Sequence, residues 1–227
     1  MFTALKKLFT RSSTTQSSSP EAKTMSTILH IDTSILGGYS VSRQLSAEIV
    51  ARQKTLHPNA TVIYRDLVEA PALHLSDKHI AAFQGAEVTD AALGADLAVG
   101  GAYIDDLFAA DVIVIGVPMY NFSIPSQLKA WIDRVCVAGR TFQYGANGPE
   151  GLLPKGKKVF IASSRGGQYT GDSPAAFLEH QETYLKAVLG FIGLSDVTVI
   201  RAEGVSRGDE VKNAALAEAK DQIAALS

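Results

Sequence analysis

Three loops of this chain carry residues that could bind an anionic, planar ligand. The first loop is rich in hydroxyl groups. Ser34, Ser40 and Ser42 lie around Gly37 and Gly38, directly before a helical pattern begins. The N-terminus of a helix offers unpaired amide donors and a partial positive charge, and hydroxyl groups there can complete a phosphate cradle. The same residues also fit an ordinary helix cap at Ser42 after a glycine turn, so this loop alone leaves both interpretations open.

An aromatic loop follows the longest aliphatic run of the chain. Met119, Tyr120, Asn121 and Phe122 lie in it, between two prolines. Its rings could form a platform for a planar ligand, whose polar edge would bond to Asn121 and to backbone amides. A buried turn that seals the end of a sheet is the alternative interpretation.

A third loop brings a hydroxyl, a cation and glycine backbone together in Ser164, Arg165, Gly166 and Gly167. Each of the three loops follows a run that predicts a strand, and the carboxyl ends of parallel strands meet at one edge of a sheet. Glycine amides at such an edge can form an anion-binding concavity. We therefore expect all three loops to bind one planar, anionic ligand.

The hydrophobic pattern predicts the sheet that would position these loops. Continuous aliphatic runs, the longest over residues 112–117, alternate with helical periodicity such as that of Leu45, Ile49 and Leu56. Continuous runs indicate strands buried on both faces, and their alternation with helices indicates a parallel sheet with right-handed crossovers. Five strands favour an α/β, flavodoxin-like three-layer sandwich with strand order 2-1-3-4-5 and helices on both faces. The expected strands cover residues 28–31, 61–64, 111–117, 159–162 and 197–200, and later helices are expected at Leu178, Leu185, Val188 and Ile192 and over residues 210–226.

Composition excludes several classes of protein. The 227 residues are 46% hydrophobic and 19% charged, as in an ordinary globular domain, and a net charge of -2 without a basic block argues against nucleic acid as a partner. No aliphatic run approaches the length of a membrane span. The single cysteine, Cys136, excludes an internal disulfide and fits a reducing compartment, so we expect a cytoplasmic protein. The five histidines show no ligand spacing, and no metal is expected.

The first 24 residues differ in composition from the rest of the chain. Lys6, Lys7 and Arg11 lie among serines, and no acid precedes Glu21. We expect a disordered extension over residues 1–24 and a single domain over residues 25–227. An organelle transit peptide is one interpretation of the extension; we favour a dispensable tail or an upstream start codon, because Met25 directly precedes the first strand.

Other catalytic motifs fail on spacing or context. The first loop lacks the G-x-G-x-x-G pattern of dinucleotide sites, so a mononucleotide phosphate fits it better. Residues 151–158 approach a Walker A loop, but Lys158 replaces the required Ser or Thr and a strand follows instead of a helix. No nucleophile elbow is present, and His30, within a predicted strand, is expected to be a packed core residue.

Together with further short motifs, the three loops resemble those of the FMN-dependent NADH azoreductases, a branch of the flavodoxin-like NADH:quinone oxidoreductase family. The matching motifs span almost all of residues 25–227, whereas residues 67–107 match less clearly. The motifs are the loop at residues 34–42, Pro118-Met-Tyr-Asn-Phe122, Gln127-Leu-Lys129 with Asp133-Arg-Val135, Gly139-x-Thr-Phe-x-Tyr144, Asn147-Gly-Pro-Glu-Gly151 and Ser164-Arg-Gly-Gly167.

The resemblance implies noncovalent FMN as the cofactor, with NADH as the electron donor. Ser34 and the segment Ser40, Val41 and Ser42 would hold the phosphate side of the flavin. Met119, Tyr120, Asn121 and Phe122, together with residues 164–167, would line its ring system. Phe142 and Tyr120 are the residues expected to contact the substrate.

The resemblance also implies that no side chain is obligatory as an acid or base, because the flavin carries the chemistry. The backbone amides of Gly166 and Gly167, with Arg165, would stabilise negative charge on the reduced ring. A surface salt bridge is the alternative role for Arg165.

The implied activity is two-electron, ping-pong transfer from NADH through FMN to quinones and to aromatic azo compounds, which are cleaved to amines. The enzyme would be a homodimer with the flavin cleft at the interface. A flavodoxin-type electron carrier without a small-molecule substrate is the main alternative, since the fold alone does not separate the two. The mild acidity of residues 25–227 and the aromatic loop at residues 139–155 favour the enzyme. A flavin reductase that releases reduced FMN is a third interpretation.

Overall fold

The computed structural model of the chain describes residues 27–227. The extension expected over residues 1–24, its targeting role and Met25 lie outside the described residues. Among residues 27–227, no helix is long and apolar enough to cross a membrane. Nor do three or more potential metal-ligating side chains gather anywhere in that range.

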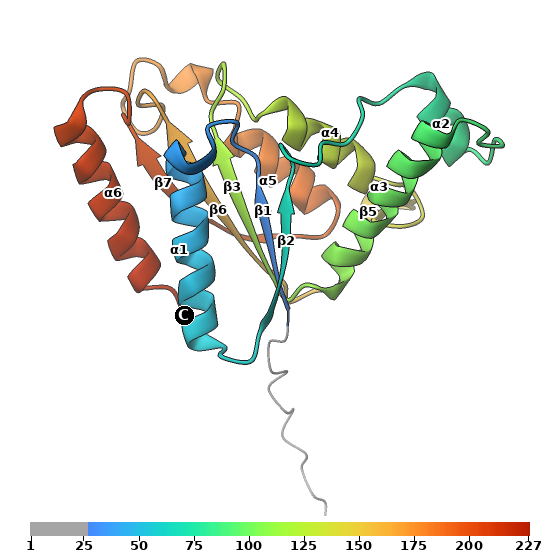
Figure 1. Cartoon of the computed structure of the whole chain (residues 1–227), viewed down its shortest axis with the longest axis horizontal. Helices are drawn as coiled ribbons and strands as arrows, with labels where there is room; N and C mark the ends of the chain where they lie inside the picture. The colour runs from blue at the N-terminus through green and yellow to red at the C-terminus, as the bar shows by residue number, and fades with distance from the viewer. Residues whose placement is uncertain (1–26) are drawn as a thin grey trace, which may run out of the picture.

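A five-stranded parallel sheet forms the middle layer of the molecule, with strand order β2-β1-β3-β6-β7 (Figure 1). The predicted flavodoxin-like topology is confirmed, because each predicted strand corresponds to one of these five. Only the numbering differs, since two short strands form a separate antiparallel hairpin within the loop at residues 139–155. The strands are β1 (Thr27–Asp32), β2 (Thr61–Asp66), β3 (Val112–Pro118), β4 (Phe142–Gly145), β5 (Gly148–Gly151), β6 (Lys158–Arg165) and β7 (Asp196–Glu203).

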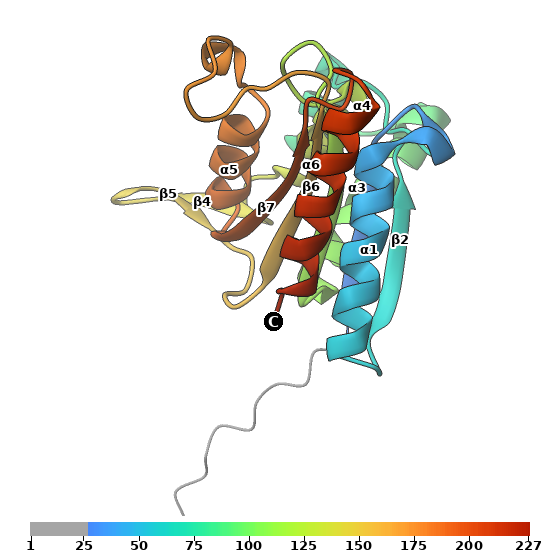
Figure 2. The same cartoon turned by 90° about the vertical axis from the view of Figure 1, so that its left-hand side faces the viewer.

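Helices cover both faces of this sheet, as the turned view in Figure 2 shows. The first and last helices pack on one face through residues such as Leu45, Ile49 and Ile223. Three further helices pack on the other face, where Trp131 and Leu185 are buried. The helices are α1 (Val41–Leu56), α2 (Asp77–Phe83), α3 (Ala91–Ala109), α4 (Ser126–Val135), α5 (Glu182–Phe191) and α6 (Asp209–Ala224), with short 3-10 turns at Gly37–Tyr39 and Ala176–Leu178.

The central strand β3 joins the two helical layers. All of its residues are buried. Ile113 and Ile115 belong to the core shared with α3, α4 and α5, whereas Val112 and Val114 belong to the core shared with α1 and α6. Successive side chains of a strand point to opposite faces of the sheet, so alternate residues of β3 enter one core and the residues between them enter the other. β3 is therefore the continuous aliphatic run that the sequence predicts for a strand buried on both faces.

The helix predicted from Leu178 onward begins later than expected. Leu178 lies in the separate 3-10 turn, and α5 begins at Glu182. The Glu179 carboxylate accepts hydrogen bonds from the amides of Glu182 and Thr183, at 2.7 and 3.3 Å. It thereby satisfies amides that have no partner within the helix and fixes where the helix starts. Hydrophobic periodicity does not report a cap of this kind.

Gly116, near the end of β3, allows α1 to approach the sheet closely. A Cβ atom at this position would lie 2.5 Å from Oδ1 of Asp32, 3.0 Å from Oγ of Ser46 and 3.2 Å from the backbone oxygen of Ser42. These three contacts come from the end of β1 and the first turns of α1. Only glycine leaves room for them without moving the start of the helix.

We predict that Gly116→Ala destabilises the protein by about 1–3 kcal/mol, because the added methyl group forces α1 away from the sheet. Urea denaturation followed by circular dichroism measures this. Gly101→Ala on α3 is the matched control: its Cβ meets no atom within 4 Å, and alanine favours the helix. Equal denaturation midpoints for the two variants would show that the close approach at Gly116 carries no cost.

Candidate functional site

The three loops meet at the carboxyl edge of the sheet, between β1, β3 and β6. Asp32 of β1 is paired with Gly116 of β3, and Pro118 with Ser164 of β6. The strand order reverses between β1 and β3, and ligands of open α/β sheets bind at such a point. Two contacts join the loops directly: Oγ of Ser34 lies 3.1 Å from the Tyr120 hydroxyl, and the Met119 amide donates to the Ser164 oxygen at 2.8 Å.

In the first loop, the hydroxyls gather at the start of α1. Ser40, rather than Ser42, is the helix cap: its Oγ accepts from the Arg43 amide at 3.3 Å and lies 3.0 Å from Oγ of Ser42. The amides of Val41 and Ser42 belong to the first helical turn and have no acceptor among residues 27–227. No acidic residue lies in this turn. The helix start therefore combines unpaired amides, the buried hydroxyls of Ser40 and Ser42 and a positive dipole end, a combination that favours an anion.

Arg43 holds this loop in place from behind. Its guanidinium donates to the Ser34 backbone oxygen at 2.8 and 3.1 Å and to both carboxylate oxygens of Asp66 at 2.5 and 2.8 Å. The hydrogen bond from Arg43 is the main reason why the pKa of Asp66 lies below its ordinary value. Since its donors are engaged in these contacts, Arg43 shapes the loop instead of pointing into it.

Buried polar groups at the end of β1 support the same loop. Oδ1 of Asp32 accepts from Ser46 at 2.7 Å, and Oδ2 accepts from the Tyr64 hydroxyl at 3.0 Å. Burial, followed by the charge of Asp32, raises the pKa of Tyr64 to about 12. Nε2 of His30 lies 3.0 Å from Oγ of Ser46, and the residue is buried. His30 is thus a packed core residue, as predicted.

The second loop is a tight turn with strained backbone. Tyr120 and Ser123 bond to each other through their backbones, and the two residues between them, Asn121 and Phe122, have φ angles of 48° and 71°. Positive φ at both central positions is typical of a type I′ turn, and it is costly for a residue as bulky as phenylalanine. The amides of Asn121 and Phe122 have no acceptor in the described range, and both side chains are exposed. The turn therefore presents donors and a ring at the surface instead of sealing the sheet.

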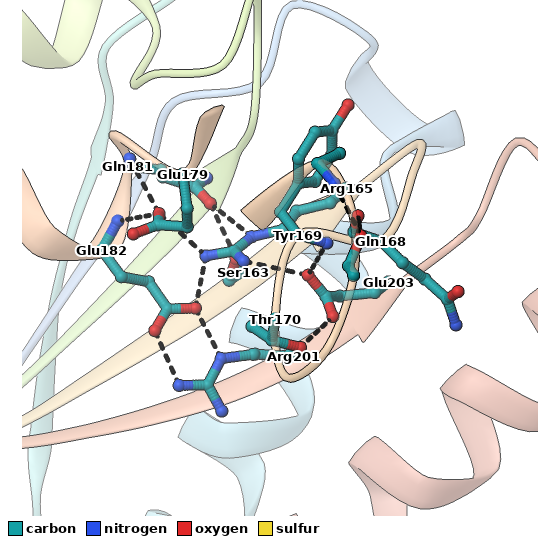
Figure 3. A network of polar contacts seen from close by, with 12 residues as sticks. Ser163, Arg165, Gln168, Tyr169, Thr170, Glu179, Gln181, Glu182, Arg201 and Glu203 are labelled. Carbon is teal, nitrogen blue, oxygen red and sulfur yellow. Dashed lines mark hydrogen bonds and ion pairs between the residues drawn. The ribbon is translucent and has the colours of Figure 1, made fainter. Parts of the chain in front are cut away.

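In the third loop, the structure separates the Arg165 side chain from the glycine backbone. Arg165 is fully buried, and its guanidinium donates to Gln181, Glu203, Glu179 and Glu182 (Figure 3). This arrangement corrects both expectations for Arg165: the cation neither faces the ligand edge nor makes a surface salt bridge. It forms a buried ionic network instead.

The backbone of Gly166 and Gly167 remains available to a ligand. Their carbonyls accept from Ser206 and Gly204, at 3.2 and 2.9 Å. Their amides have no acceptor among the residues that the structure describes. Ser164 is buried beside them. Unpaired glycine amides held in a fixed direction can stabilise developing negative charge without reorganising.

The structure does not bring Phe142 to these loops within one chain. Its ring packs on Phe191, with centroids 4.4 Å apart. Phe191 ends α5, about 15 Å along the helix from the end that faces the loops. The β4–β5 hairpin that carries Phe142 projects away from the sheet (Figure 2). Tyr120, the other expected substrate contact, does lie at the site.

Two residues at this edge were not found from the sequence. Glu203 ends β7 and lies beside the third loop, and Tyr169 follows that loop and packs edge-on against Phe122 at 6.1 Å. A hollow of about 620 Å³ lies beside them, lined also by Gly167, Thr170 and Arg207. Glu203 lies near the carboxyl end of a predicted strand, and the other three site loops begin at the same end of their strands. This position could have identified Glu203 from the sequence as a candidate site residue.

The donors at this edge fit a ligand with a phosphate and a planar polar ring. One set of free amides lies at the start of α1 beside Ser40 and Ser42. The others lie on the two loops that follow the neighbouring strands β3 and β6. No carboxylate of the described residues lies in the first turn of α1. These features match the FMN site that the sequence resemblance implies.

Comparisons with known proteins agree with this geometry. A family model described as flavodoxin-like fold matches residues 26–226. The chain is 55% identical over 199 residues to an FMN-dependent NADH:quinone oxidoreductase 2 of Bradyrhizobium diazoefficiens, covering 88% of this chain and 98% of that protein. It is 54% identical over 197 residues to an FMN-dependent NADH:quinone oxidoreductase of Sinorhizobium fredii, covering 87% and 95%.

Two solved structures of azoreductases also resemble the whole fold of this chain. An azoreductase from Bacillus anthracis superimposes with a TM-score of 0.76 at 29% identity, covering 89% of this chain and all of that one. An FMN-dependent NADH-azoreductase from the same species, in complex with FMN, superimposes with a TM-score of 0.76 at 27% identity, covering 88% and 98%.

The contact between Arg43 and Asp66 leads to a prediction about acid stability. The pKa of Asp66 is lowered in the folded state, so its ionised form stabilises the protein above the ordinary value of 3.8 and the effect is lost as the pH falls through the folded value. We expect Asp66→Asn to cost about 1–2 kcal/mol at pH 7 and progressively less below about pH 4. Asp105→Asn, at an exposed pair with Arg140, is the control, and urea denaturation at several pH values is the measurement. A cost independent of pH would contradict this account.

Proposed function

The chain belongs to the family of proteins with the flavodoxin-like fold, and on that premise we propose that it is an FMN-dependent NADH:quinone oxidoreductase that also reduces aromatic azo compounds. The observation that carries this proposal is the set of free amides at one edge of the sheet, on Val41, Ser42, Asn121, Phe122, Gly166 and Gly167. The names of the relatives supply the cofactor, the electron donor and the acceptor classes.

Each loop has a distinct part in holding the cofactor. Ser34, Ser40 and the amides of the first turn of α1 bind the phosphate side. Residues 119–122 and 164–167 line the ring. When bound, FMN would supply hydride-transfer chemistry between NADH and the acceptor, two electrons per cycle, with two cycles for cleavage of an azo bond to amines. The protein then needs no obligatory acid or base of its own.

The amides of Gly166 and Gly167 stabilise the negative charge that reduction places on the ring. Both are unpaired in the described range and fixed by carbonyl contacts to residues 204–206. Preorganised amides of this kind are worth most in a site that excludes water. Because the Arg165 side chain is buried among carboxylates, we propose that these two amides stabilise the charge without it.

The acceptor pocket is formed by two copies of the chain. Tyr120 lies at the site of its own chain, whereas Phe142 lies on a projecting hairpin, away from its own three loops. A homodimer in which each hairpin reaches the flavin of the partner subunit reconciles these positions with the sequence resemblance. We further propose that the enzyme works in the cytoplasm; its single cysteine, Cys136, makes no disulfide, and burial raises the pKa of its thiol to about 11.

Stopped-flow mixing tests the function. The FMN-loaded protein is mixed with NADH and then with a quinone or an azo dye. Bleaching of the flavin by NADH and rapid recolouring by either acceptor are expected. A flavin that is not reduced by NADH, or that recolours only with a protein partner, would replace the enzyme with an electron carrier. Release of reduced FMN into a filtrate would identify a flavin reductase.

Replacing Ser40 and Ser42 together by alanine should weaken FMN binding by about 1–3 kcal/mol, because two hydrogen bonds to a charged phosphate are lost. The rate of turnover at saturating FMN should change little. Titration of FMN fluorescence gives the dissociation constant. Ser76→Ala, which removes a hydroxyl cap from α2, is the control for loss of a helix cap. An unchanged FMN affinity in the double variant would limit the two serines to capping α1.

Phe142→Ala should raise KM for quinone and azo acceptors roughly 3-fold to 10-fold, the cost of losing one aromatic contact. FMN content should stay at the level of the parent protein. Steady-state kinetics with two acceptors of different size measure the change, and sedimentation shows whether the protein remains a dimer. Acceptor kinetics identical to the parent would place the acceptor pocket elsewhere.

A further inference from the structure

A network of five charged side chains lies directly behind the third loop, and the proposed chemistry does not use it (Figure 3). Arg165 and Glu182 are buried, whereas Glu179, Glu203 and Arg201 are half-buried. Arg165 is the centre of the network: it donates to Glu203 at 2.9 Å, to Glu179 at 3.2 Å and to Glu182 at 2.5 Å. Arg201 pairs with both carboxylate oxygens of Glu182, at 2.6 and 2.7 Å. Three carboxylates thus face two guanidinium groups: that of Arg165 is closed to water, whereas the Arg201 side chain is 38% exposed.

Hydrogen bonds shift the pKa values of two members of the network, Glu179 and Arg201. Burial alone would raise the pKa of Glu179, but the Glu182 amide, the Thr183 side chain and the charge of Arg165 together hold it below its ordinary value. Hydrogen bonding to Glu182 raises the pKa of Arg201. Buried ion pairs add little net stability, so their value often lies in fixing one arrangement of the chain.

Glu203 connects this network to the backbone of the third loop. Its Oε1 accepts from the Tyr169 amide at 3.0 Å in addition to Arg165, and its Oε2 accepts from the Thr170 hydroxyl at 2.5 Å. The carboxylate therefore anchors the chain two and three residues beyond Gly167. Its two oxygens point in different directions, and a shorter side chain could not reach both sets of donors.

Tyr169 carries this anchoring to the loops that face the ligand. A Cβ atom on Gly167 would lie 3.1 Å from the Tyr169 hydroxyl, so this ring covers the glycine backbone. On its other side the ring meets Phe122 edge-on at 6.1 Å. One anchored tyrosine thus touches both the second and the third loop.

We propose that Glu203 is a positioning residue: through Arg165 and Tyr169 it fixes the direction of the Gly166 and Gly167 amides, and it does not touch the flavin. This inference rests on the proposed function and adds to it the group that sets the geometry of charge stabilisation. Arg165 is then the centre of this ionic network and not a cation that acts directly on the flavin.

Two variants separate geometry from charge. Glu203→Gln removes the charge and the acceptor of the Thr170 hydroxyl, but it keeps an oxygen that can accept from Arg165 and from the Tyr169 amide. Glu203→Asp keeps the charge but withdraws the carboxylate by one methylene group. Positioning predicts that the Asp variant is impaired and that the Gln variant resembles the parent, whereas a direct effect of charge predicts the reverse order.

The first readout is the rate of flavin reduction at saturating NADH, measured by stopped flow. We expect Glu203→Asp to be roughly 10-fold to 100-fold slower than the parent, as for a misplaced catalytic group. Glu203→Gln should stay within about threefold of the parent rate. Glu210→Asp and Glu210→Gln are the matched controls. Glu210 and Glu203 both line a groove between β7 and α6, but Glu210 has no hydrogen bond to the third loop, so neither control should change the rate.

The second readout is hydrogen–deuterium exchange of the protein without FMN. The peptide covering residues 166–183 should exchange faster in Glu203→Asp and at the parent rate in Glu203→Gln, because only the former loses the anchor at Tyr169. A parent-like Asp variant, or a Gln variant as slow as Asp, would overturn the proposal. A parent protein that is not reduced by NADH would overturn the proposed function instead, and the exchange experiment would still decide the role of Glu203.

Discussion

The parallel alignment of β1, β3 and β6 is the constraint on which the site depends. Asp32 is paired with Gly116, and Pro118 with Ser164, so the three chains leave the sheet side by side. Each following loop must begin at that edge, where the amides of Asn121, Phe122, Gly166 and Gly167 have no acceptor among residues 27–227. The close approach of α1 at Gly116 adds a helix start to the same edge. The topology of the sheet therefore gathers unpaired amides at one edge, where we propose that the anionic cofactor binds.

Two arginines hold the loops that this topology brings together. Arg43 links the first loop to Asp66 of β2, and Arg165 links the third loop to Glu203 of β7. Guanidinium groups suit this task because their donors form a rigid planar fork that can bond several acceptors at once. Both arginines lie beside the proposed phosphate and ring positions, yet both are occupied by carboxylates. Under the proposed function, hydroxyls and backbone amides bind the cofactor without adding side-chain charge.

Much of this could be predicted from the sequence because it depends on local patterns. The aliphatic run at residues 112–117 indicates a central strand, and hydroxyls and glycines after strands indicate the loops that bind. The role of Arg165 could not be predicted in this way, because its acceptors lie between 14 and 38 residues away along the chain. Phe142 illustrates the same limit, since its role depends on where the hairpin lies in space. The start of α5 depends on the Glu179 carboxylate, and a hydrophobic period carries no information about a cap.

We propose that unpaired backbone amides at one edge of the sheet bind the cofactor. Titration of the 15N-labelled protein with FMN, followed by amide chemical shifts, tests it most directly. We expect the largest shifts at Val41, Ser42, Asn121, Phe122, Gly166 and Gly167, six amides of the three loops that have no acceptor in residues 27–227. Shifts confined to the groove between β7 and α6, around Val211 and Glu218, with none at these six amides, would contradict it.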